Sequence, residues 1–171
     1  TINFSKGDGT DRIVLVKSGI AVDAIPVDAT TYTASATFSS GQEIGTGNRV
    51  VYSGTGASVT VTGLTANTTY YVAVFEFKGT GGNTNYLTSS PVTGSQLTLV
   101  AAPSAPTNLT FGSVTYNSFT ASFSAPGTPP TGYLVVRRKG EVISGVPVGG
   151  TEYTVGQYVG STALNEIIYV G

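Results

Sequence analysis

Hydrophobic and polar residues alternate with a period of two along several short stretches of the chain, a pattern typical of β-strands with one buried face. Glycine or proline turns bound each stretch, and no stretch has the periodicity of a long amphipathic helix. The clearest stretches are residues 12–17, 58–62, 70–77, 118–124, 133–138 and 166–170. Many short strands separated by turns predict an all-β fold of the sandwich type.

The sequence contains an internal repeat with an offset of 121 residues, the distance from Ile13 to Leu134 (134 − 13 = 121). This offset carries residues 26–33 onto residues 147–154, where five of the eight positions are identical. After a shortening of four residues, residues 48–54 fall on residues 165–171. Two copies of one structural unit are therefore predicted.

A proline-containing stretch lies between the two copies. Pro103 and Pro106 favour an extended conformation and cannot donate hydrogen bonds to a β-ladder. We interpret residues 99–106 as a semi-rigid linker. The predicted organisation is a first unit at residues 1–98, this linker, and a second unit at residues 107–171.

Composition restricts the functions that we expect. Charged residues make up 10% of the chain, the net charge is −1, and no run of Lys or Arg is longer than residues 137–139. Binding to nucleic acid is therefore not expected. The chain has no Cys and no His, which removes disulfides and most arrangements of a nucleophile and a base. Because so few catalytic arrangements remain, we predict that the chain is not an enzyme. No apolar run has membrane-spanning length, so we do not predict membrane insertion.

Acidic residues are the remaining candidates for chemistry. Asp8 and Asp11 lie in the glycine turn at residues 7–11 and could ligate calcium through their oxygens. Two acids in such a turn fall short of the ligand run of a known calcium motif, so we interpret them as turn-forming residues, with calcium as the alternative. Glu76 lies in an apolar strand, and we expect the strand to end or bend there and leave the carboxylate solvated.

Part of the first unit resembles the fibronectin type III domain. Gly63-Leu64, Thr69-Tyr70 and the apolar run at 71–75 resemble the corner between strands E and F and strand F of that family. The resemblance implies that Tyr70, six positions after Leu64, buries its ring while its hydroxyl bonds to backbone. Val72 and Val74 would then face the core. Residues 102–110 and 118–123 resemble the family's strands A and B.

A narrower resemblance is to sandwich repeats of very large secreted and surface proteins of Bacteroidota. It is carried by residues 7–17, 26–32, 43–48 and 85–88. The resemblance implies a secreted or cell-surface location and a role as stalk or adhesive spacer, with neighbouring repeat units as partners. The alternative that it implies is an accessory module of a secreted polysaccharide-degrading enzyme.

The loop at residues 79–86 resembles the loop between strands F and G, where members of the fibronectin family often place contact residues. Asn83, Asn85 and Tyr86 are therefore candidates for contacting a glycan or a cell-surface ligand. The glycines of this loop are equally expected in any mobile hairpin connection. With no Trp in the chain, we take the tyrosines as cross-strand packing residues, with a carbohydrate platform as the alternative.

Compared with the family pattern, both units are incomplete. The first begins at the position of strand B and lacks strand A, and the second lacks the counterpart of residues 55–98. We therefore predict two tandem immunoglobulin-like sandwiches of fibronectin type III type, both truncated. The residues expected to point inward are Ile13, Leu15, Tyr70, Val72 and Val74 in the first unit, and Phe119 or Phe123 with Leu134 and Val136 in the second.

Overall fold

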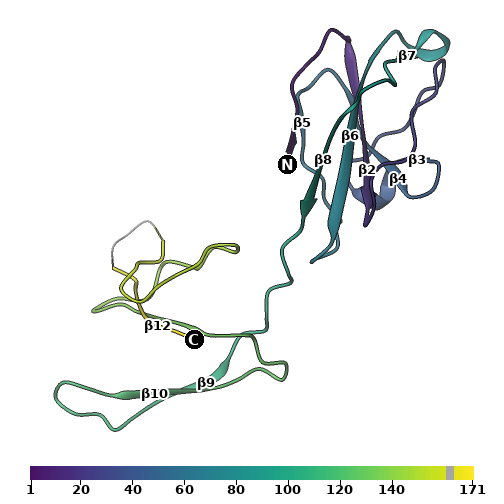
Figure 1. The fold of residues 1–171 in the computed structure, drawn as a ribbon. Helices are drawn as coiled ribbons and strands as arrows, with labels where there is room; N and C mark the ends of the chain where they lie inside the picture. Colours follow the sequence, from purple (N-terminus) through teal and green to yellow (C-terminus); the bar gives the residue numbers. More distant parts are fainter. Residues whose placement is uncertain (161–163) are drawn as a thin grey trace. The chain divides into compact units, whose positions relative to one another are not determined.

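A computed structural model describes residues 1–160 and 164–171 and shows an all-β protein (Figure 1). The chain forms two compact units, Thr1–Val100 (unit one) and Ala101–Gly171 (unit two). Their sheets are antiparallel and curled, which is consistent with a β-sandwich. Within the described ranges, helix is limited to two short 3₁₀ turns, η1 (Phe38–Ser40) and η2 (Gly81–Asn83).

Unit one is built on one antiparallel sheet whose two central and longest strands are β2 (Asp11–Ser18) and β6 (Thr69–Lys78). All eight residues of β2 pair with β6, from Asp11 opposite Phe77 to Ser18 opposite Tyr70. The other strands of this sheet are β3 (Glu43–Ile44) and β4 (Asn48–Gly54) beside β2, and β7 (Asn85–Tyr86) and β8 (Val92–Leu97) beside β6.

A two-stranded sheet of β1 (Ile2–Asn3) and β5 (Ser58–Val59) accompanies one face of this larger sheet. The apolar cluster on that face consists of Phe4, Val14, Val16, Val51, Val59, Tyr70 and Val74, with Val72 packed against it. The cluster on the opposite face consists of Ile13, Leu15, Ile44, Val50, Ala73, Phe75 and Tyr86. Side chains from the segment before β3 pack on this second cluster: Val22, Ala24, Tyr32 and Ala34.

The five residues expected to point inward in unit one are buried or packed against a cluster, but they lie on both faces of the sheet. Ile13 and Leu15 belong to one cluster, whereas Tyr70, Val72 and Val74 belong to the other. Residues 13–16 read Ile-Val-Leu-Val, an uninterrupted apolar run, and all four side chains are buried. A strand covered on both faces needs no polar alternation, which explains the run.

The described residues of unit two form two pairs of strands. A hairpin joins β9 (Thr107–Gly112) to β10 (Thr120–Ser124), and β11 (Leu134–Arg137) pairs with β12 (Glu166–Val170). Residues 101–106, within the predicted linker, form no strand. Phe119 is 63% exposed and Phe123 is 39% exposed, so the expected inward position of these rings is wrong. The physical reason is that β10 pairs only with β9 in the described part of unit two, and their faces stay open.

The pairing of β11 with β12 in unit two follows the same register as the pairing of β2 with β4 in unit one. In both pairs a bulge shifts the register, between Val14 and Leu15 in β2 and between Val135 and Val136 in β11. The equivalent Cα partners are Ile13–Ser53 and Leu134–Val170, Val14–Tyr52 and Val135–Tyr169, and Leu15–Val50 and Val136–Ile167. A bulge imposes a local bend and twist, so its recurrence gives both strand pairs the same local shape.

Hydrogen bonds outside the strands also recur. Asn48 and Asn165 are both fully buried, and the side-chain amide of each accepts a backbone N–H, from Asp23 and from Ser144. Each amide also donates to a backbone carbonyl, that of Ile44 and that of Val159, and Asn48 donates in addition to the carbonyl of Thr46 and to Oδ1 of Asp23. In the same way, the hydroxyls of Tyr32 and Tyr153 accept the N–H of Val27 and Val148 at 3.0 and 2.9 Å.

Differences in length between the units fall in two connections of this shared frame. Gln42 and Gln157 bond the backbone of Thr33 and Thr154 in the same way. Six residues, 36–41, have no counterpart before Gln157. Between Ile44 and Asn48 there are three residues, and between Val159 and Asn165 there are five. The balance, minus six plus two, is the shortening of four residues found in the sequence.

Candidate functional site

A surface depression of about 300 Å³ lies in unit one at the end of β6. Its lining brings together several residues that the sequence singled out, from the turn after Gly7, from β6 and from β7. They are Asp8, Gly9, Glu76, Phe77, Lys78, Asn85, Tyr86 and Leu87. What this site can do chemically depends on the hydrogen bonds and ion pairs that its polar side chains form within the protein.

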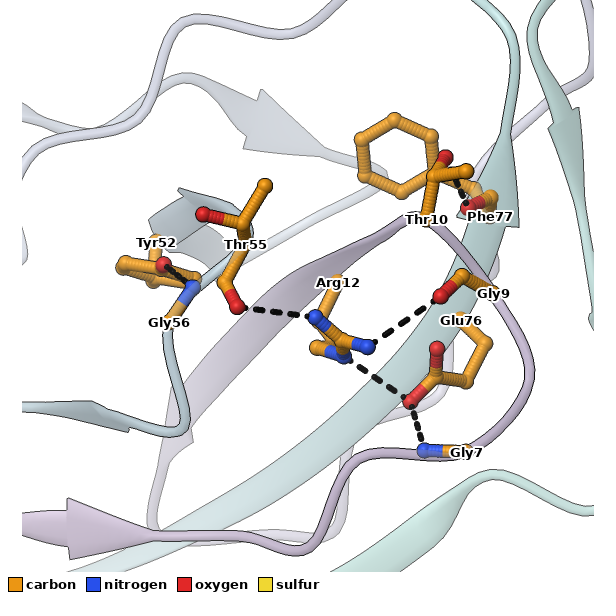
Figure 2. Close-up of polar contacts among 9 residues, drawn as sticks. All are labelled: Gly7, Gly9, Thr10, Arg12, Tyr52, Thr55, Gly56, Glu76 and Phe77. Carbon is orange, nitrogen blue, oxygen red and sulfur yellow. Dashed lines mark hydrogen bonds and ion pairs between the residues drawn. The ribbon is translucent and has the colours of Figure 1, made fainter.

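The guanidinium of Arg12 is the centre of the polar network beside the depression (Figure 2). Arg12 is 3% exposed, and its Nε donates to Oε1 of Glu76 at 3.1 Å. Its Nη1 donates to the carbonyl of Thr55 at 2.9 Å, and its Nη2 donates to the carbonyl of Gly9 at 3.2 Å. The guanidinium therefore ties three separate segments together.

Glu76 is not solvated, so the expectation from the sequence is wrong. Its side chain is 16% exposed, and its Oε1 also accepts the N–H of Gly7 at 2.7 Å. Arg12 lies directly opposite Glu76 in the register of β2 and β6, which supplies the ion pair that a buried carboxylate requires. The sequence alone did not single out this pair, since β2 carries three charged residues and β6 carries two.

The second carboxylate oxygen of Glu76, Oε2, is buried and has no hydrogen-bond partner among the described residues. The turn at residues 7–9 packs closely over it. A Cβ atom on Gly9 would lie 2.3 Å from Oε2, and one on Gly7 would lie 3.2 Å from Cδ of the same side chain. Gly9 therefore has no room for a side chain while the turn covers the carboxylate, whereas a side chain at Gly7 would require Glu76 to shift slightly.

The calcium candidates do not converge. Asp8 is exposed and its carboxylate lies 3.6 Å from Nζ of Lys78. Asp11 is the first residue of β2, opposite Phe77. In the part of the chain that the structure describes, no group of three or more His, Cys, Asp or Glu side chains is placed to hold a metal ion. Asp8 thus faces a cationic side chain instead of a shared ligand set.

The three residues of the predicted contact loop differ in exposure. Asn83 ends η2 and Asn85 begins β7, and both are exposed. Tyr86 is buried, with its ring 5.0 Å from that of Phe77 and its hydroxyl donating to the carbonyl of Thr30 at 3.0 Å. Burial raises the pKa of the Tyr86 phenol, and the nearby Tyr32 and Asp28 raise it further. Tyr86 therefore packs inside the unit, and the two asparagines form the accessible part of this loop.

The corner before β6 is fixed by Tyr70. Its ring is buried and meets the ring of Phe38 edge-on at 5.1 Å. The N–H of Thr65 donates to the Tyr70 hydroxyl at 2.9 Å. Leu64, the residue before Thr65, is partly exposed, and Val72 and Val74 follow Tyr70 on the same face of β6. The hydroxyl thereby satisfies a backbone donor in the turn.

Comparison of the chain with protein-family models, curated proteins and solved structures finds no match. The resemblance to fibronectin type III repeats thus rests on the residues quoted from the sequence. Among the described residues, no helix has the length and apolar character needed to cross a membrane.

The polar groups around the depression are engaged with one another and with the backbone. Oε1 of Glu76 already accepts two hydrogen bonds, and its Oε2 is covered by the turn. Asp8 and Lys78 neutralise each other at the rim. The lining therefore brings no nucleophile beside a general base, which acid–base and nucleophilic catalysis both require.

Proposed function

We propose that this chain is a non-catalytic structural and adhesive repeat segment of a large extracellular or cell-surface protein, in which it acts as a spacer or stalk. Its two units are tandem copies of an immunoglobulin-like sandwich of fibronectin type III type. The partners of such a segment are neighbouring copies of the same unit, and its accessible loops are the places where a glycan or surface ligand would bind.

The observation that carries this proposal is the hydrogen-bond frame that recurs in the two units, at an offset of 121 residues before the shortened connections and of 117 residues (165 − 48) after them. The same bulge, the same buried asparagine and the same tyrosine-to-backbone bond occur in each. Duplication that keeps the buried frame while the surface changes is expected of an array, in which each unit is selected for its fold.

The use of charged groups supports the same role. Arg12 and Glu76 form hydrogen bonds that join the turn at residues 7–9, β2 and β6. The side-chain amides of Asn48 and Asn165 donate to backbone carbonyls. A segment that transmits tension benefits from side chains that tie neighbouring strands together. The stretch between the units contains two prolines, which limits how far it can collapse.

Single-molecule force spectroscopy on the full chain, held between two marker domains, tests the role as a spacer. Unit one has 100 residues, so its cooperative unfolding should release a contour length of roughly 330–360 Å, less the folded end-to-end distance. Arg12→Met should lower the force of that event, because it removes the ties among three segments. Smooth extension of unit one without a force peak would contradict the proposal.

A binding assay on the same protein distinguishes the role as a spacer from the alternative role as an accessory module. A spacer should give no saturable binding to a panel of soluble polysaccharides. Saturable binding that is lost when Asn83 and Asn85 are both changed to Ala would instead assign the chain to a carbohydrate-binding accessory role. Hydrolysis of a glycan, ester or peptide that survives repurification and is lost on a single carboxylate substitution would contradict the non-enzymatic role.

A further inference from the structure

The turn that covers Glu76 contains Asp8 followed by Gly9. This is the one place in the chain where an aspartate or asparagine precedes a glycine. Because glycine has no side chain, its backbone nitrogen can approach the carboxyl carbon of the preceding residue without steric hindrance. The product of that approach is a five-membered succinimide ring. In a folded protein, ring formation depends on how firmly the carboxylate and the amide are held.

Neither reacting group of this pair is held by the residues that the structure describes. The side chain of Asp8 is 90% exposed, and the cation beside it, Nζ of Lys78, lies 3.6 Å away. Among the described residues, the Asp8 carboxylate accepts no hydrogen bond and the N–H of Gly9 donates none. The carbonyl of Gly9, in contrast, accepts a hydrogen bond from Arg12 at 3.2 Å (Figure 2). The reacting groups are therefore free within a turn that is anchored beside them.

Asp28 shows the opposite arrangement. Its Oδ1 accepts the N–H of Tyr86 at 2.7 Å, and the N–H of the next residue, Ala29, donates to the carbonyl of Thr84 at 2.7 Å. Ala29 has a left-handed φ of 59°, and its counterpart in unit two is Gly150, with φ 78°. A glycine at position 29 would therefore fit without strain. This position offers a chemically matched pair whose reacting groups are both held.

We propose that Asp8-Gly9 is a site of spontaneous backbone isomerisation, at which aspartate converts to isoaspartate and the turn over Glu76 opens. The nitrogen of Gly9 attacks Cγ of Asp8. The N–Cγ bond forms, the Cγ–OH bond breaks, and the proton of the N–H leaves with that oxygen as water. A second water then opens the ring at the carbon of the former peptide carbonyl, which becomes a free carboxylate. The main chain now runs through Cβ and Cγ of residue 8.

This modification changes the turn because the turn has little spare room. Isomerisation lengthens the main chain between Asp8 and Gly9 by one carbon atom. A Cβ atom on Gly9 would already lie 2.3 Å from Oε2 of Glu76 and 3.1 Å from the backbone nitrogen of Phe77, so that side has no space for a longer chain. The carbonyl of Gly9 then moves away from Arg12, and the unpaired Oε2 gains access to water. The inference is independent of the proposed role as a spacer.

Incubation of the folded Ala29→Gly chain at neutral pH and physiological temperature tests the proposal. This variant contains two Asp-Gly pairs, at residues 8–9 and 28–29, which differ in structure and not in the chemistry of the pair. Isoaspartate at each position is quantified by peptide mapping with electron-transfer fragmentation. Residue 8 should convert at least about fivefold faster than residue 28, because exposed and unbonded groups reach the reactive geometry with little local unfolding. A smaller ratio would overturn the proposal.

Two reference samples separate structure from sequence. In the same variant unfolded in urea, the two pairs should convert at equal rates, and slow conversion of residue 28 there would overturn the structural explanation. A peptide of residues 4–13 carries the first pair without the fold. Asp8 in the folded chain should convert within about tenfold of the rate in this peptide. A slower conversion would mean that the turn protects the pair, and would overturn the proposal.

Opening of the turn is tested with Asp8→Asn, whose side chain loses ammonia instead of water and forms the same succinimide faster. After conversion, the urea midpoint of unit one should fall by about 0.5 M or more relative to the fresh variant, as expected for loss of a hydrogen bond to a charged group. The matched control is Asp8→Glu, which would need a six-membered ring and should keep its midpoint through the same incubation. An unchanged midpoint in the converted Asp8→Asn chain would overturn the opening of the turn.

Discussion

Replacing Arg12 with methionine removes a guanidinium from which three nitrogens donate hydrogen bonds, to Glu76, to the carbonyl of Thr55 and to the carbonyl of Gly9. The substitution leaves a largely buried carboxylate without its counter-ion and two carbonyls without this donor. Breaking a buried ion pair by removing one partner costs about 3–5 kcal/mol. We therefore expect Arg12→Met to lower the free energy of unfolding of unit one by about 3–5 kcal/mol.

Removing both charges should cost less than removing one. In the double variant Arg12→Met with Glu76→Leu, no uncompensated charge is left between β2 and β6, and the apolar side chains can pack in its place. We expect this variant to recover at least about half of the stability lost by the single variant. A coupling free energy near zero would mean that the ion pair does not act as a unit.

The assay is urea unfolding of the full chain, followed by circular dichroism and tyrosine fluorescence. With an m-value of about 1–2 kcal/mol/M, the midpoint of unit one should fall by about 1.5 M or more. The matched control is Arg49→Met, whose ion pair with Glu43 is 31% and 36% exposed and should contribute at most about 1 kcal/mol. If Arg12→Met costs no more than Arg49→Met, the reasoning about burial is refuted.

Two other predictions concern tyrosines of unit one. Tyr70→Phe should cost about 1–3 kcal/mol in urea unfolding, because the N–H of Thr65 loses its acceptor, and an unchanged midpoint would remove the role of this hydroxyl. Because burial raises the pKa of Tyr86 in the folded state, its contribution to stability is present below the ordinary pKa of a tyrosine, about 10, and is lost as pH rises through the raised pKa. Tyr86→Phe should therefore flatten the loss of stability measured from about pH 9 to about pH 11, whereas Tyr116→Phe, at a position 99% exposed, should leave it unchanged.

The sequence predicted the strands whose apolar pattern is strong. Strand β12 coincides with the predicted stretch 166–170, and β11 and β6 agree with their stretches within a residue or two. It did not single out β8, whose six residues are all exposed and carry little apolar periodicity. Such an edge strand is held by backbone pairing with β6, and backbone pairing leaves no mark in the side-chain pattern.

The polar site was harder to predict, because it depends on the register between strands far apart in the chain. Arg12 and Glu76 are 64 residues apart, and only the pairing of β2 with β6 places them opposite each other. The second layer over Ile13 and Leu15 escaped prediction for a related reason. It is made by Val22, Ala24, Tyr32 and Ala34, from a segment in which the structure shows no strand and the sequence no clear period.

The two connections in which the units differ in length have a consequence for protein engineering. Between Thr33 and Gln42 one unit carries six residues that the other omits, and the bonds that frame this connection are the same in both. Lengthening a surface connection carries only a small entropic penalty, about 0.6 kcal/mol for each doubling. In unit two this connection is only Val155 and Gly156, both exposed, and it is therefore suited to the grafting of an epitope or binding loop. In unit one the same place already carries Phe38, which packs against Tyr70, so a designer would vary what the second unit displays and leave the first unchanged.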